Sequence, residues 1–162
     1  MALSYLKYFI FLVVLILVQK TFIWLIALSN LNITPDIVII AVVYIGIKKG
    51  KIEGAIAGFL AGLVIDYLSG SFIGLLALSY SIAGFISGFF KDENDKYLTK
   101  YFFLLVVFVC SLIVYFLYFT IYFQGASINF SEIIIKYVFT TSAYTTIISI
   151  VYALFLKKKK GY

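Results

Sequence analysis

The chain has 162 residues, of which 64% are hydrophobic and 12% are charged, and its formal net charge is +6. So few charged residues cannot cover the surface of a soluble domain of this length. Histidine and arginine are absent and Cys110 is the only cysteine, which excludes disulfides, metal sites built from cysteine and histidine, and histidine-activated nucleophiles.

The apolar runs of the sequence are long and continuous. A helix needs roughly 20 apolar residues to cross a bilayer, whereas the strands of a membrane barrel show alternating polarity. We therefore expect an all-α integral membrane protein, a single polytopic membrane domain over residues 1–162 with about six transmembrane helices in one bundle. Such a chain leaves no segment for a soluble catalytic domain, so we expect no enzymatic activity and no cofactor.

The first predicted helix runs from about Tyr5 to Leu28 and is interrupted by Gln19 and Lys20. Its beginning resembles a secretory signal peptide, because Lys7 precedes an apolar stretch. The stretch is longer than the apolar region of a signal peptide, and further apolar segments follow it. We therefore interpret it as a transmembrane helix.

The second predicted helix has a clear start signal. Thr34 is the expected N-cap, Pro35 takes the first helical position, and Asp36 lies beside the positive end of the helix dipole. The helix ends near Ile47, before three lysines, and is therefore about 18–20 Å long. A re-entrant half-helix would place these lysines in hydrocarbon at about 2.5–3.5 kcal/mol each. We expect a short spanning helix with snorkelling lysines and local thinning of the bilayer.

Four further helices follow. The third covers about Ile52 to Leu68 and the fourth about Ser71 to Phe90, with Gly70 in the turn between them. After a charged loop, the predicted fifth and sixth helices cover about 101–123 and 131–156, and a lysine tail follows.

The lysines predict the orientation of the bundle. With the N-terminus in the cytoplasm, all of the 13 basic residues except Lys20 and Lys136 fall in cytoplasmic segments. Cytoplasmic segments of membrane proteins are enriched in lysine and arginine. We therefore expect both termini to be cytoplasmic, and we expect the lysines to contact membrane lipids rather than nucleic acid.

Glycines recur at four-residue intervals on the third and fourth predicted helices. Small residues at this spacing allow helix backbones to approach closely in lipid. Two interpretations are open: tight packing within the chain, or an interface for the transmembrane helix of a partner. The stripe consists of Gly54, Gly58, Gly62, Gly84 and Gly88.

Asp66 continues the glycine spacing and falls in the last turn of the third helix, where the helix dipole disfavours an anion. An acid there should point into the bundle and needs a cation, a hydrogen-bond donor or water. Its role is open between structure and function, whereas a helix start alone explains Asp36. We expect an outer-half polar cluster of Lys20, Asp36, Asp66 and Lys136, with one of the two lysines paired to Asp66.

Tyrosines are frequent in the last two predicted helices. Tyrosines near helix ends are typical of interfacial belts, and some of these could instead line a ligand cavity. The set includes Tyr115, Tyr118, Tyr122, Tyr137, Tyr144 and Tyr152.

The stretch from Gly54 to Gly74 reads Gly-x3-Gly-Phe-x2-Gly-Leu-x2-Asp-x-Leu-Ser-Gly-Ser-x2-Gly. Together with Gln19, the Pro35–Asp36 pair and the following Leu-Leu-Ala-Leu, it resembles the rod-shape-determining MreD family. The specific part of the resemblance covers roughly residues 34–88, and beyond it only the hydropathy agrees.

The resemblance implies a non-enzymatic subunit of the bacterial cell-elongation machinery in the inner membrane. It also implies a partner like MreC, which has one membrane helix and a periplasmic coiled coil. The MreD family resembles the vitamin-binding subunits of energy-coupling-factor transporters in fold. The alternative is therefore a small-molecule-binding subunit of an importer, which would need polar side chains that converge on a cavity.

Overall fold

The computed structural model describes residues 2–22, 34–70, 72–91, 100–125 and 129–155. The regular elements in these ranges are all helical, which confirms the all-α expectation. In chain order they are α1 (Ala2–Phe22), α2 (Ile37–Lys49), α3 (Lys51–Ser69), α4 (Leu75–Ser87), the 3-10 turn η2 (Gly88–Phe90), α5 (Lys100–Tyr122), α6 (Phe130–Glu132), the π-helical η4 (Ile133–Phe139) and α7 (Thr140–Phe155).

Within the described residues, three stretches are long and apolar enough to cross a membrane, judged by length and composition. They are α3, α5 and the stretch Phe130–Ala153 that joins α6, η4 and α7. Two shorter apolar helical stretches lie at Leu12–Thr21 and Leu75–Phe90. These lengths and compositions are those of a membrane protein.

The start of α2 differs from the expected one. Asp36, and not Thr34, is the N-cap, since its backbone is extended at φ −109° and ψ 101° and its carboxylate accepts hydrogen bonds from the first turn. The helix therefore begins at Ile37, and Pro35 precedes it instead of occupying its first turn.

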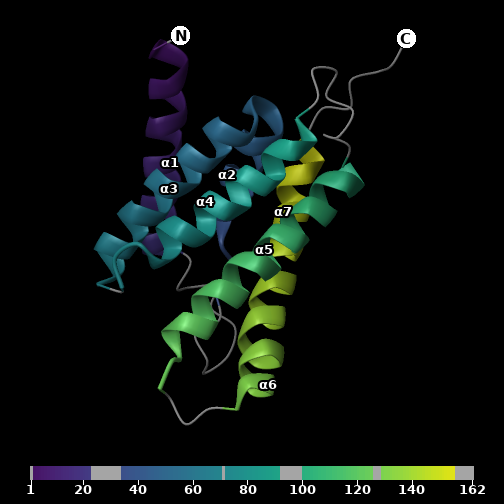
Figure 1. Ribbon diagram of the computed structural model, residues 1–162. Helices are drawn as coiled ribbons and strands as arrows, with labels where there is room; N and C mark the ends of the chain where they lie inside the picture. The colour runs from purple at the N-terminus through teal and green to yellow at the C-terminus, as the bar shows by residue number, and fades with distance from the viewer. Residues whose placement is uncertain (1, 23–33, 71, 92–99, 126–128, 156–162) are drawn as a thin grey trace.

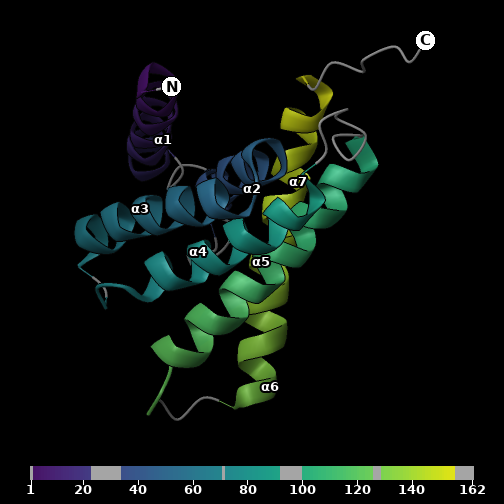
Figure 2. The ribbon, with the colours of Figure 1, turned by 45° about the horizontal axis from the view of Figure 1, so that its top comes forward.

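α2 is the central helix of the bundle (Figures 1 and 2). It packs against α1, α3, α4, α5 and α7, and most of its side chains from Val38 to Ile47 are buried. A helix that is apolar all round belongs in such a position. Its 13 residues pack against protein on most sides, and the expected thinning of the bilayer stays a prediction.

α3 and α4 lie side by side in both views, and α7 runs across their direction (Figures 1 and 2). The glycine stripe lies between these two helices of the same chain. A Cβ added at Gly58 would overlap the carbonyl oxygen of Tyr80, and one added at Gly84 would overlap that of Gly54. The remaining overlaps of this kind join Gly62 to Ala77 and Gly88 to Lys51.

The turn between α3 and α4 depends on two glycines with left-handed backbones. Gly70 ends α3 at φ 62° and Gly74 precedes α4 at φ 101°. Residues with side chains rarely adopt this region. α4 begins after the second glycine, at Leu75, and the start expected at Ser71 falls on a residue outside the described ranges.

Candidate functional site

The first turn of α2 is buried, and side chains from three helices satisfy its amides. Asp36 Oδ1 accepts hydrogen bonds from the amides of Val38 and Ile39 at 3.0 and 3.2 Å. Gln19 Oε1 of α1 accepts hydrogen bonds from the amides of Ile37 and Val38, each at 3.1 Å. The amide of Asp36 donates to Thr145 Oγ1 of α7 at 3.1 Å. These bonds replace the water that is absent from a bilayer interior.

The other carboxylate oxygen of Asp36 binds two tyrosines from different helices. Tyr80 of α4 and Tyr115 of α5 donate to Oδ2, the second at 3.0 Å. Both tyrosines and the carboxylate are buried. Asp36 thus accepts four hydrogen bonds from neutral donors, which is the condition for burying a charge without a basic partner.

We call these five side chains the Asp36 hub: Gln19, Asp36, Tyr80, Tyr115 and Thr145. They come from α1, the start of α2, α4, α5 and α7. The Asp36 carboxylate, together with the side chains that bond to the backbone beside it, therefore connects five helices. The hub fixes how the α3–α4 pair sits against the α5–α7 pair, because Tyr80 belongs to one pair and Tyr115 and Thr145 belong to the other.

Asp66 caps a helix other than its own. Its Oδ2 accepts from the amides of Gly74, Leu76 and Ala77 at 2.9, 3.1 and 3.3 Å, and its side chain is fully buried. Gly74 precedes α4 and has no side chain to serve as a cap. Asp66 therefore supplies the negative charge that the start of α4 favours, although it lies at the unfavourable end of α3.

The lysines have partners other than the expected one. Lys20 donates to Ser69 Oγ, and Lys136 forms an exposed ion pair with Glu132 at 3.4 Å. Backbone amides of α4 hold the Asp66 carboxylate, because the turn after α3 brings these unpaired amides directly over it, which is a favourable charge–dipole contact. The pairing of a lysine with Asp66 stays a prediction.

A cavity of about 280 Å³ lies beside the Asp36 hub, and we call it the inner cavity. Four hub side chains line it, and tyrosines of α5 and η4 complete its wall. The principal lining residues are Gln19, Asp36, Tyr80, Tyr115, Tyr118 and Tyr137.

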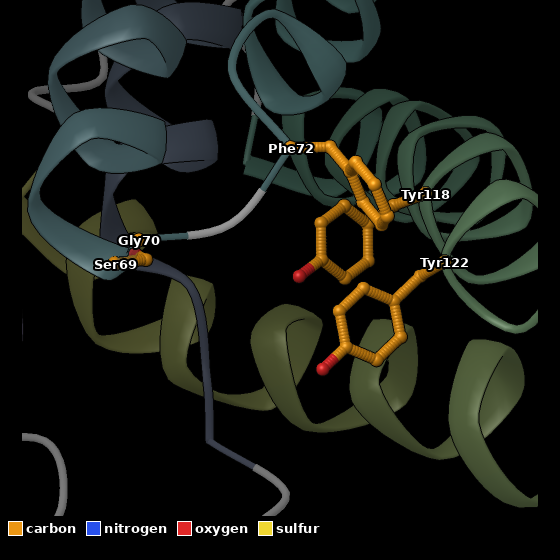
Figure 3. A pocket seen from close by; sticks show the side chains of 5 residues that line it. All are labelled: Ser69, Gly70, Phe72, Tyr118 and Tyr122. Carbon is orange, nitrogen blue, oxygen red and sulfur yellow. The ribbon is translucent and has the colours of Figure 1, made fainter.

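A second cavity of about 430 Å³, the outer cavity, lies between α5 and the α3–α4 turn. Its lining residues are Ser69, Gly70, Phe72, Tyr118 and Tyr122. Figure 3 shows the hydroxyls of Tyr118 and Tyr122 pointing the same way, from α5 toward the end of α3. Their rings are stacked with centroids 5.5 Å apart. Because Tyr118 lines both cavities, the two are adjacent.

The profile of the family described as rod shape-determining protein MreD matches residues 2–158. The chain belongs to the MreD family. This confirms the resemblance drawn from the Gly54–Gly74 stretch and extends it over nearly the whole chain. No curated protein and no solved structure matches the chain. The MreD family makes the chain a membrane protein of the machinery that determines rod shape.

Sequence reasoning missed two residues of the hub in this MreD-family chain, Tyr80 and Thr145. Each of these residues has a sequence feature that could have indicated it. Tyr80 is the only tyrosine within α4. Thr145 belongs to a polar stripe on an otherwise apolar helix, and such a stripe marks the face that points into a bundle. The stripe consists of the buried residues Thr141, Ser142, Thr145 and Ser149.

Proposed function

We propose that this chain is a non-enzymatic, multi-pass subunit of the bacterial inner membrane. It scaffolds the cell-elongation machinery by binding a bitopic partner that resembles MreC, and through that partner it supports peptidoglycan synthesis. The family match over residues 2–158 carries the proposal.

The use of the buried carboxylates supports a structural role. Asp36 accepts four hydrogen bonds and Asp66 is held by the amides of α4. A general base must have a lone pair free for the proton that it removes from a substrate. The lone pairs of these two carboxylates instead accept hydrogen bonds that hold helices together.

The positions of the helix ends support a bundle of six crossings with both termini in the cytoplasm. The start of α1, the junction of α2 with α3, and the end of α7 lie toward the top of Figure 1. The junction carries Lys48, Lys49 and Lys51. The joint between α5 and α6 lies at the opposite end, and the described residues of that joint, 123–125 and 129, contain no lysine. This distribution is the one that the positive-inside rule requires.

Co-purification tests the partner. The tagged chain is co-expressed with the MreC-like protein of the same genome and is extracted in mild detergent. We expect the two to elute together, and we expect the complex to persist when the partner's periplasmic coiled coil is removed, because the membrane helix supplies the contact. An unrelated protein with a single membrane helix is the control and should elute separately.

Photo-crosslinking locates the interface. A crosslinking residue replaces one exposed apolar side chain on each outer helix face, at Val14, Ile56, Leu105 or Ile147. A specific interface gives a crosslink to the partner from one face or from two adjacent ones. Separate elution of the two proteins, together with no crosslink from any face, would contradict the proposal.

A further inference from the structure

The inner cavity contains a negative charge without a basic partner in the described part of the chain. The donors to Asp36 are two backbone amides and two tyrosine hydroxyls, all of them neutral, and the side chain is only 4% exposed. A charge in such a low-dielectric site acts strongly on whatever enters the neighbouring space. The cavity therefore favours a cation.

The walls of the cavity are aromatic, which favours a particular kind of cation. Phe119 and Tyr137 line the cavity with ring centroids 5.5 Å apart, and Phe119 is stacked between Tyr115 and Phe123 at 5.9 Å from each, which leaves Tyr137 as the more open ring. Aromatic faces attract organic ammonium groups, and cages of such faces recognise quaternary ammonium ligands. Tyr80 and Tyr115 donate to a carboxylate, and this polarises the phenols and makes their rings more electron-rich.

We propose that the inner cavity binds a small ammonium group, presented by a free ammonium compound such as choline or by the headgroup of a zwitterionic lipid. The volume of about 280 Å³ lies just below the range of cavities for drug-sized ligands, roughly 300–1,000 Å³, and suits a smaller group of this kind. The proposal does not depend on where the partner binds.

The outer cavity provides room for the rest of such a ligand. It shares Tyr118 with the inner cavity, and Ser69 on its wall accepts a hydrogen bond from Lys20. A carboxylate therefore lines the inner cavity, and a lysine is bonded to one residue in the wall of the outer cavity. A zwitterion with its ammonium group inside and its phosphate outside matches this arrangement.

Binding is measured on the purified full-length chain in detergent by isothermal titration with choline. The matched control ligand is 3,3-dimethyl-1-butanol, which has the shape of choline but no charge. A second arm incubates the chain with vesicles of phosphatidylethanolamine and phosphatidylglycerol and identifies the retained lipid by native mass spectrometry. Saturable choline binding assigns the site to free ammonium compounds, and selective retention of the ethanolamine lipid assigns it to headgroups; either result supports the proposal.

Three variants test whether the ligand binds in the inner cavity. Tyr137→Leu removes a ring face without touching Asp36 and should weaken binding about tenfold, as expected for loss of one desolvated cation–π contact. Tyr137→Phe keeps the ring and should bind like the original chain. Tyr67→Leu changes a side chain that is 78% exposed and serves as the control. If Tyr137→Leu fails to fold, Tyr118→Leu takes its place.

The proposal fails if choline and its neutral analogue bind equally, or if neither choline nor the ethanolamine lipid is bound in preference to its control. It also fails if a folded Tyr137→Leu chain binds as tightly as the original.

Discussion

At the scale of single residues, Asp36 differs from an ordinary N-cap. An exposed N-cap bonds to the amides of its own helix, whereas Asp36 also binds Tyr80 and Tyr115 from two other helices. Gln19 adds a second acceptor from outside the helix. The start of α2 can therefore lie in the protein interior with its polar groups satisfied.

Removing one tyrosine hydroxyl tests this assignment. Tyr80→Phe keeps the ring and deletes a donor to a buried carboxylate, so it should lower the free energy of unfolding by about 1.5–3 kcal/mol, the value of a hydrogen bond to a charged group. Tyr115→Phe should act in the same direction. Thermal melts in detergent measure the effect, with the exposed Tyr67→Phe as control. Unchanged melting of both hub variants would show that these hydroxyls do not hold Asp36.

Asp66 gives a second prediction at this scale. Asp66→Ala leaves the amides of α4 without an acceptor and should cost about 1–3 kcal/mol. Asp66→Asn keeps one carbonyl oxygen and should cost less. Because amides hold the carboxylate, adding Lys20→Met or Lys136→Met to Asp66→Asn should not restore the melting temperature. Restoration by either lysine change would return Asp66 to the ion pair expected from the sequence.

At the scale of elements, α3 and α4 form the most closely packed pair, because their glycines bring backbone against backbone. Helix association in lipid depends on such packing. Leucine at position 58 would need the space that the Tyr80 backbone occupies, and the same residue carries a hydroxyl of the hub. Disruption of this pair should therefore also disturb Asp36.

Gly58→Leu should lower the melting temperature markedly or prevent folding. Ile56→Leu, at a position on the same helix that is 54% exposed, should melt like the original chain. The measurement is the monodisperse fraction in size-exclusion chromatography together with the thermal melt. A stable Gly58→Leu chain would mean that the two helices do not meet at this stripe.

Several features of the helices can be predicted from the sequence. The glycine spacing predicted close helix approach, and the interruption at Gln19 marked a residue that binds another helix. The choice between a lysine and an amide partner for Asp66 could not be made, because it depends on how Gly70 and Gly74 fold the turn over the carboxylate. Likewise, no local pattern predicts that Tyr80 and Thr145 both bond to Asp36, the first at its carboxylate and the second at its backbone amide.

At the scale of the whole molecule, the topology can be tested by cysteine labelling. Cys110 is buried and is first replaced by serine. A cysteine at Gln124, an exposed position beside the α5–α6 joint, should react with a membrane-impermeant maleimide on intact spheroplasts. A cysteine at Lys51 should react only after the membrane is permeabilised. The reverse labelling pattern would show that the bundle has the opposite orientation in the membrane.

The most direct test of the proposed function is complementation of cell shape. We expect bacteria depleted of their own MreD protein to lose rod shape, as the family's description implies. These cells are supplied with this chain and the MreC-like protein of the same genome. We expect rod shape to return with the original chain and with Ile56→Leu, and we expect it to fail with Gly58→Leu. Cells that stay round although the original chain is present in the membrane at normal levels with its partner would contradict the account.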